Sequence, residues 1–383
     1  MLPRLHRHRW MDADLEAFRE QVRKLIEAEF APKVEKWRSL GHIPRKQWCR
    51  LAEMGALLPE LDQRYGGSGA SKAYQLVVVH ELARVEIPVI TGVHPIVAHY
   101  IRDYGTDEQK QRWLPRMASG ELFGAIALTE PGAGSDLKAI ATRATREGDE
   151  YVITGSKTFI SNAYSGNLLI VAARTGGAGS EGVTLIVLET DGLPGFKVSR
   201  RLKKIGLHAS DTSELLFDSV RVPVANRLGR EEGKGFVQLM SQLAYERLML
   251  AVMAAAVTER AVEFTVDYTR QRKAFGASLS DLQNTRFKLA ECATVAHLST
   301  SYVNDCMQRL LDGTLDDEAA YMAKWWCTEQ LCRVTDECLQ LFGGYGYMEE
   351  YPIARMFADA RIQKIVGGTN EIMKDLIARK LFA

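Results

Sequence analysis

The residues with the clearest capacity for chemistry lie in a glycine-containing loop and in an apolar helical segment. The loop, 129–135, holds two glycines and one proline and follows a short apolar run. Glycine lets the backbone approach a flat ligand closely, but the Gly-Ala-Gly here lacks the spacing of a dinucleotide-binding turn. In the helical segment, Glu246 is either a general base whose pKa is raised by burial or an exposed carboxylate paired with Arg247 or Arg260.

Three stretches of the chain, which differ in their pattern of apolar residues, must position these residues. From 12 to about 120, apolar residues recur every three or four positions, which predicts helices. From about 122 to 223, short runs rich in β-branched and aromatic residues predict strands at 151–153, 168–171, 183–188 and 215–217. From 235 onward, long helical periodicity returns and predicts a four-helix bundle.

The bulk composition favours an ordinary globular protein without a nucleic-acid or membrane partner. The chain has 383 residues, which suggests two or three domains, and its formal net charge is +1. Its six cysteines include no C-x-x-C pair, so we expect no metal site and reduced thiols in a cytoplasmic protein. The basic segment 1–10 is not followed by an apolar stretch, which argues against a secretory signal.

Four motifs together resemble the acyl-CoA dehydrogenase family, and they cover nearly the whole chain. They are LTEPGAGSD at 128–136, RKAFG at 272–276, QLFGGYG at 340–346 and GGTNE at 367–371. The resemblance implies an α+β multidomain fold in three parts. These are an N-terminal helical domain at 1–121, a middle antiparallel β domain at 122–232 and a C-terminal four-helix bundle at 233–383.

The resemblance also implies a bound FAD. In the family, the loop matching 126–135 lies along the isoalloxazine ring, and an arginine matching Arg272 pairs with the pyrophosphate of a neighbouring subunit's FAD. Outside these motifs, a lone Phe in a strand is usually core and a lone Arg at a helix end is usually solvated. The cofactor-binding residues expected from the motifs are Ile126, Ala127, Leu128, Thr129, Gly134, Ser135, Phe159, Ile160, Ser161, Arg272, Phe275, Gln283, Gln340, Leu341, Phe342, Gly343, Gly344, Thr369, Asn370 and Glu371.

The position of the catalytic base departs from the commonest family pattern. Many members carry the base directly before the Gly-Thr of the last motif, where this chain has Gly367. A branch resembling long-chain and isovaleryl-CoA dehydrogenases carries a glutamate on the long helix of the third domain, and the sequence around Glu246 matches that pattern. We therefore expect Glu246 to be the base, with Gly367 keeping its backbone N–H as a donor to the thioester oxygen. The substrate-binding residues expected with it are Ser135, Val237, Ala244, Arg247, Gly367 and Gly368.

The implied activity is FAD-dependent conversion of a medium-chain, long-chain or branched acyl-CoA to the trans-2-enoyl-CoA. An electron-transferring flavoprotein is the expected acceptor, and a homo-oligomer, commonly a dimer of dimers, is the expected assembly in a bacterial cytoplasm. His94 either touches the substrate or caps a helix. An acyl-CoA oxidase and a DNA-associated member of the fold remain alternatives, whereas a nitroalkane oxidase would need an aspartate as its base, and neither 246 nor 367 is one.

Overall fold

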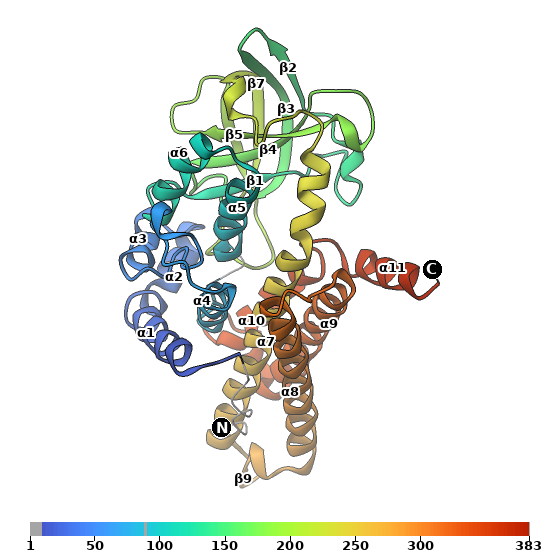
Figure 1. Ribbon diagram of the computed structural model, residues 1–383. Helices are drawn as coiled ribbons and strands as arrows, with labels where there is room; N and C mark the ends of the chain where they lie inside the picture. The colour runs from blue at the N-terminus through green and yellow to red at the C-terminus, as the bar shows by residue number, and fades with distance from the viewer. Residues whose placement is uncertain (1–9, 88–89, 383) are drawn as a thin grey trace.

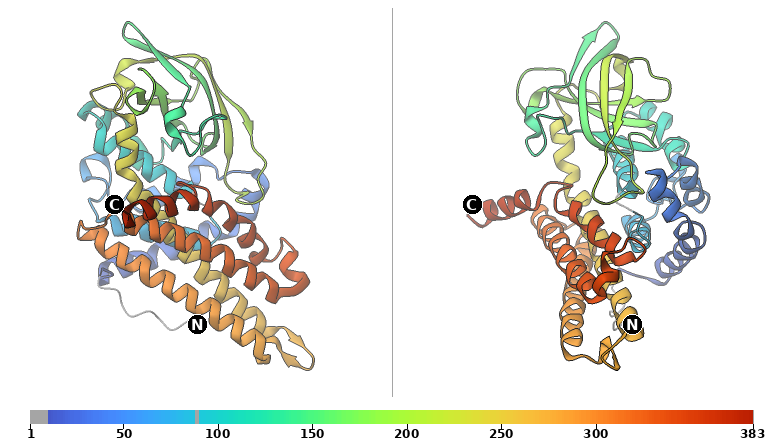
Figure 2. Two further views of the ribbon diagram at one scale, coloured as in Figure 1. Left: turned by 90° about the vertical axis from the view of Figure 1, so that its right-hand side faces the viewer. Right: turned by 180° about the vertical axis from the view of Figure 1, so that it is seen from behind.

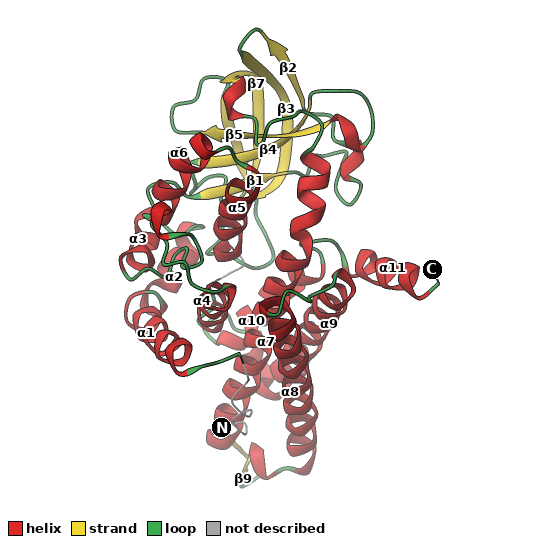
Figure 3. Ribbon diagram, viewed as in Figure 1, coloured by secondary structure: helices red, strands yellow, loops and turns green. Residues whose placement is uncertain are grey.

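The computed structural model describes residues 10–87 and 90–382, and its elements follow the order helices, strands, helices (Figure 1, Figure 3). The N-terminal part consists of α1 (Ala13–Glu29), α2 (Val34–Leu40), α3 (Arg45–Glu53), α4 (Lys72–Arg84), α5 (Ile90–Tyr104) and α6 (Asp107–Ala118). Side-chain caps fix where two of these helices begin: Asp12 accepts from the Leu15 N–H at 2.8 Å, and Thr106 forms a capping box with Gln109. The basic segment at the N-terminus lies almost wholly outside the described residues.

A curled seven-stranded sheet forms the middle of the chain. Its strands are β1 (Gly124–Ala127), β2 (Arg143–Glu147), β3 (Glu150–Ser161), β4 (Leu168–Arg174), β5 (Val183–Glu189), β6 (Phe196–Arg201) and β7 (Thr212–Pro223). The predicted strands all lie within these bounds. The sheet is antiparallel as expected except where β4 runs parallel to β1 and, at one residue pair, to β2. The sheet is therefore mixed, because β1 and β4 are not neighbours in sequence and the chain between them makes the β2–β3 hairpin.

Strands β4 and β5 are apolar along nearly their whole length because both of their faces are covered. Alternate residues point to opposite faces of a strand. Thus Leu168 and Ile170 pack into the core shared with the N-terminal helices, while Leu169 and Val171 pack into the core of the sheet itself. This double burial joins the sheet firmly to the helices that precede it.

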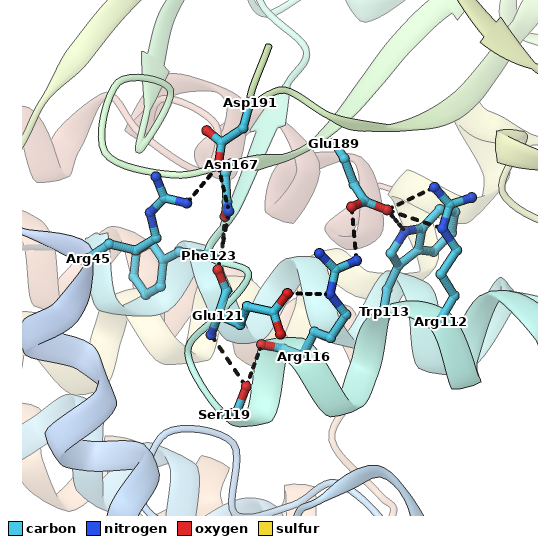
Figure 4. A network of polar contacts seen from close by, with 10 residues as sticks. All are labelled: Arg45, Arg112, Trp113, Arg116, Ser119, Glu121, Phe123, Asn167, Glu189 and Asp191. Atoms are coloured by element: carbon cyan, nitrogen blue, oxygen red, sulfur yellow. Dashed lines mark hydrogen bonds and ion pairs between the residues drawn. The ribbon is translucent and has the colours of Figure 1, made fainter. Parts of the chain in front are cut away.

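Polar contacts strengthen the same junction (Figure 4). Glu189, at the end of β5, accepts hydrogen bonds from three side chains of α6: Arg112 at 2.8 Å, Trp113 at 3.0 Å and Arg116 at 2.9 Å. Beside it, Asn167 accepts from the backbone N–H of Phe123 at 2.8 Å, directly before β1. These bonds fix α6 and β1, and hence the neighbouring α5, in relation to the sheet.

The C-terminal part is built on three long helices. Its elements are α7 (Gly235–Gln271), the small hairpin β8 (Lys273–Ala274) and β9 (Ala277–Ser278), α8 (Gln283–Leu311), α9 (Asp317–Phe342), α10 (Pro352–Ala360) and α11 (Asn370–Leu381). The short α10 packs on α7 and α9 as the fourth helix, and α11 projects outward from the side of α9 (Figure 2). No helix among the described residues is long and apolar enough to cross a bilayer.

Candidate active site

Glu246 lies on α7 where this helix passes α5, and its carboxylate is held by a tyrosine. The Tyr100 hydroxyl, on α5, donates to Glu246 Oε1 at 3.0 Å. Glu246 is partly exposed, so a ligand can reach it, while the four residues that follow it on α7 are buried. Burial raises the pKa of Glu246 to about 7, against the opposing effects of the Tyr100 hydroxyl and of Arg247. The carboxylate is therefore set to exchange a proton near neutral pH.

The loop that carries Gly367 and Gly368 lies against the same helix. Arg247 is buried and donates from Nε to the Gly367 carbonyl at 3.4 Å, while its guanidinium stands 4.6 Å from the Tyr321 ring centre. A Cβ added to Gly367 would overlap the Leu250 side chain, one turn after Glu246. Within the described part of the chain, the backbone N–H of Gly367 has no hydrogen-bond acceptor. This amide is thus free to donate to a ligand.

A buried lysine holds the loop from the other side. Lys324, on α9, has no exposed surface and donates to the Gly368 carbonyl at 2.7 Å and to Asn370 Oδ1 at 2.9 Å. Burial, followed by the nearby Arg247, lowers the pKa of Lys324 to about 8. Lys324 lies outside the four sequence motifs, although a lysine within an otherwise apolar helical stripe is a visible signal.

The other residues expected to contact the substrate are Val237, Ala244 and Ser135. Val237 and Ala244 lie on α7 nine and two residues before Glu246. At about 100° per residue, both side chains leave the helix roughly half a turn away from that of Glu246. Val237 is 66% exposed, and Ser135 is exposed on the loop after β1. Val237 and Ala244 therefore do not surround the carboxylate, and any contact they make with the same ligand lies at some distance from it.

His94 has a structural role in the fold. It is fully buried, accepts from the Gly124 N–H through Nδ1 at 3.0 Å and contacts the Met117 carbonyl through Nε2 at 3.2 Å. Its ring stacks on Phe123 at 4.5 Å, and burial lowers its pKa to about 3. Of the two roles considered for His94, the structure favours the one at a helix end, since the Met117 carbonyl lies in the last turn of α6.

The glycine-containing loop is anchored by a buried ion pair below it. Lys157, on β3, donates to the Leu128 carbonyl at 3.0 Å and to Glu130 Oε1 at 2.8 Å, and burial lowers its pKa to about 8. Glu130 in turn accepts the backbone N–H groups of Ala141 and Thr142. These contacts hold one side of the loop in place and leave its other side exposed.

An aromatic ring stands exposed next to this loop. Phe159 is 66% exposed and has a φ of 59°, a left-handed conformation that is unusual for an aromatic residue. The neighbouring Thr158 N–H donates to the Thr129 carbonyl at 2.9 Å, which keeps β3 beside the loop. A Cβ built on Gly134 meets open space, so the backbone here is accessible to a flat ligand. The loop and Phe159 thus lie side by side, and Ser161, two residues further along β3, is half-buried.

A further group of candidate residues lies at the far end of the bundle, whereas Thr369 and Glu371 lie at the first turn of α11. Arg272 follows the last residue of α7 and stands 5.4 Å from the Tyr345 ring centre, and Phe275 at the hairpin tip is 96% exposed. The other exposed candidates at this end are Gln283, Gln340, Gly343 and Gly344. Figure 1 shows this end and the sheet at opposite ends of α7. One chain therefore cannot bring both groups to a single small ligand.

Three candidate side chains are used inside the fold. Ile160 is buried in the sheet core, and Phe342 is buried with its ring stacked on Tyr268 at 3.9 Å. Asn370 has no exposed surface and donates to Glu329 while accepting from Lys324. Only the backbone of these residues is available to a cofactor.

Family models match three successive parts of the chain. The acyl-CoA dehydrogenase N-terminal domain matches residues 12–121, the middle domain 125–220 and the C-terminal domain 233–382. The chain belongs to the acyl-CoA dehydrogenase family. It is thus an oxidoreductase of a flavoprotein family, with the fold expected from its motifs.

Individual members of the acyl-CoA dehydrogenase family match over almost the full chain. The long-chain specific acyl-CoA dehydrogenase, mitochondrial, of Sus scrofa is 41% identical over 97% of this chain and 87% of its own length. The acyl-CoA dehydrogenase structure from Geobacillus kaustophilus is 44% identical, with a TM-score of 0.95 over 98% of this chain and 100% of that one. The butyryl-CoA dehydrogenase structure from Megasphaera elsdenii is 34% identical, with a TM-score of 0.92 over 97% of this chain and 99% of that one.

The surface features of this acyl-CoA dehydrogenase fit the flavin of its family. The surface formed by Phe159 and the loop 129–135 offers an exposed aromatic ring and, at Gly134, open backbone, as a flat heterocycle requires. At the far end, Arg272 is an exposed planar cation, and Cβ atoms built on Gly343 and Gly344 meet open space. An arginine beside unobstructed backbone is suited to a pyrophosphate.

Proposed function

We propose that the protein is an FAD-dependent acyl-CoA dehydrogenase that uses Glu246 as its base and converts a long-chain acyl-CoA thioester to the trans-2-enoyl-CoA. The observation that carries this proposal is the accessible Glu246 carboxylate, with a pKa near 7, on the segment of α7 against which the loop of Gly367 packs through Arg247 and Leu250. A base is most effective when its pKa lies near the working pH, and a backbone N–H can stabilise charge that develops on an oxygen.

Glu246 acts on the carbon next to the thioester carbonyl. Its ionised carboxylate accepts the proton from this α-carbon, and the electron pair of the broken C–H bond becomes the second bond between the α- and β-carbons. When bound, FAD supplies the acceptor for the hydride that leaves the β-carbon. Arg247, buried beside the base and bonded to the Gly367 carbonyl, keeps the loop against the helix during this step.

Gly367 stabilises the thioester oxygen as negative charge develops there. Its N–H is held in place because Lys324 and Arg247 bind the carbonyls of this loop. A fixed donor needs no reorganisation when the charge appears, which is the origin of its catalytic effect. A side chain at this position would press on Leu250, so glycine lets the donor come close to the helix.

The two groups of cofactor-binding candidates serve different copies of the chain. Residues 126–135 with Phe159 hold the flavin of their own subunit, and Arg272 with 340–344 hold the pyrophosphate end of a partner's FAD. The spacing along α7 supports this division, because the 26 residues from Glu246 to Arg272 span about 39 Å of helix. A homo-oligomer is therefore required for a complete cofactor site.

The substrate and acceptor can be tested in one series of titrations. The purified enzyme is mixed anaerobically with butyryl-, octanoyl-, palmitoyl- and isovaleryl-CoA while the flavin absorbance is followed. We expect bleaching to be fastest with palmitoyl-CoA and the reduced enzyme to be reoxidised by an electron-transferring flavoprotein. Rapid peroxide formation on admitting oxygen would instead identify an oxidase, and the absence of bleaching with every thioester would contradict the proposed function.

A further inference from the structure

Tyr100 directs its hydroxyl proton to one oxygen of Glu246. The side chain is 1% exposed, and its hydroxyl lies 3.0 Å from Glu246 Oε1 and 3.4 Å from the Leu239 carbonyl. A hydroxyl has one proton to donate, and an ionised carboxylate oxygen at the shorter distance is the stronger acceptor. Oε1 is therefore occupied, whereas no residue of the described chain donates to Oε2.

The position of this hydroxyl is fixed by the packing of α5. This helix contacts both β1 and α7, and Tyr100 belongs to the core that these elements share. One turn further along α5, the Tyr104 hydroxyl is hydrogen-bonded to Ser241 of α7. The two tyrosine rings lie 6.2 Å apart in a tilted arrangement. Tyr100 thus has little freedom to follow a moving carboxylate.

We propose that Tyr100 is a positioning residue for the base: it holds Glu246 by Oε1 and so leaves Oε2 to accept the α-proton of the substrate. The inference rests on the proposed function, in which Glu246 is the base. The hydroxyl also stabilises the ionised carboxylate, which limits how far burial suppresses its ionisation. Burial and the neighbouring Glu246 raise the pKa of Tyr100 well above its usual value, so it stays a donor throughout the working range.

The other charged groups nearby are engaged elsewhere. Arg247, on the same helix, bonds to the Gly367 carbonyl and faces Tyr321. From α9, Lys324 bonds to the loop beyond Gly367. The buried pair of Glu60 and His99 contacts Tyr245, the residue before Glu246. Tyr100 is accordingly the group whose removal changes the hydrogen bonding of the carboxylate directly.

The pH dependence of flavin reduction tests this role. Tyr100→Phe keeps the ring and removes the donor, while Tyr104→Phe removes a hydroxyl contact between the same two helices and serves as the matched control. The rate of flavin reduction by palmitoyl-CoA is measured by stopped flow across a range of pH, and it should rise with pH as Glu246 ionises. We expect Tyr100→Phe to shift this rise to a pH about one unit higher and to slow reduction at pH 7 about fivefold. Tyr104→Phe should show the same rise of rate with pH as the wild type. A Tyr100→Phe profile that matches wild type in both rate and pH dependence overturns the inference.

A second readout separates this inference from the proposed function. The Glu246 carboxyl band is assigned in infrared spectra from the difference between wild type and Glu246→Gln, and it is titrated without substrate. We expect the band to titrate at higher pH in Tyr100→Phe. This shift supports the coupling of Tyr100 to Glu246 even if no acyl-CoA reduces the flavin, a failure that counts against the proposed function alone. An unchanged carboxyl titration overturns the inference whatever the activity.

Discussion

Gly367 packs against Leu250, and a Cβ on the glycine would overlap the Leu250 side chain. Gly367 also has a φ of 66°, in the left-handed region where glycine carries no steric cost. Leu250 follows Glu246 by one helical turn, so the glycine lets the 367–370 loop lie against the segment of α7 that carries the carboxylate. The side chain that fills the space beside Gly367 is therefore that of Leu250, one turn after the carboxylate.

Gly367→Ala should destabilise the protein and slow flavin reduction, because both the backbone conformation and the contact with Leu250 become unfavourable. Gly313→Ala is a matched control, since Gly313 has a φ of 70° but its added Cβ meets open space. In chemical denaturation, we expect Gly313→Ala to lower the free energy of unfolding by about 1 kcal/mol and Gly367→Ala to lower it by at least about 1 kcal/mol more. Equal costs in the two variants would show that the contact with Leu250 is unimportant.

Glu246→Gln should raise thermal stability at alkaline pH. The pKa of Glu246 in the fold is about 7, above its usual value of 4.5, so the folded state holds this proton more tightly than the unfolded chain. Stability is thus lost as pH rises from about 4.5 through 7, and the uncharged glutamine avoids this loss. We expect the variant to melt a few degrees above wild type at pH 8, with a smaller difference at pH 5. Glu20→Gln, at an exposed position of α1, is the control for the substitution itself. A gap of equal size at pH 5 and pH 8 in Glu246→Gln would argue against a Glu246 whose pKa is raised in the fold.

Lys324→Met should loosen the loop that holds Gly367. The substitution keeps a similar length but removes the donor to the Gly368 carbonyl and to Asn370, which then remain buried without it. We expect a loss of about 2–4 kcal/mol in urea unfolding and slower flavin reduction. Lys364→Met removes a 26% exposed partner of Glu329 on the same side of the molecule and should cost less than about 1 kcal/mol. Similar losses in both variants would refute a special role for Lys324.

Arg272→Gln should reduce the FAD content of the purified protein. Glutamine cannot pair in two places with a pyrophosphate, whereas arginine can. Arg270→Gln alters another exposed cation two residues earlier, whose carboxylate neighbour is Asp267 at 4.0 Å, and should leave the ratio of flavin to protein absorbance unchanged. Full FAD retention in Arg272→Gln would mean that the far end of the bundle does not hold the cofactor.

The fold could be predicted from the sequence because its signals are local. The apolar run 183–188 became β5 (Val183–Glu189), and the long periodic segment around Glu246 became α7. The parallel pairing of β1 with β4 was missed because it joins segments about 40 residues apart, and residue patterns within a strand do not encode its partner.

The site was harder to predict because its key contacts are long-range. Glu246 and Gly367 were paired through their motifs, but the donor to the carboxylate comes from Tyr100, which lies 146 residues earlier. No periodicity distinguishes this tyrosine from any other core residue on α5. Conversely, Phe342 and Asn370 fall within motifs, yet their side chains are used for packing and internal hydrogen bonds, which only the tertiary structure reveals.

Anaerobic stopped-flow reduction of Glu246→Gln by palmitoyl-CoA tests the central claim most directly. Glu259→Gln is the control, because this glutamate lies on the same helix and is hydrogen-bonded by Thr300 instead. We expect Glu246→Gln to retain FAD and lose at least about a thousandfold in the rate of flavin bleaching, while Glu259→Gln stays close to wild type. Bleaching of FAD-loaded Glu246→Gln at a near wild-type rate would contradict the assignment of Glu246 as the base.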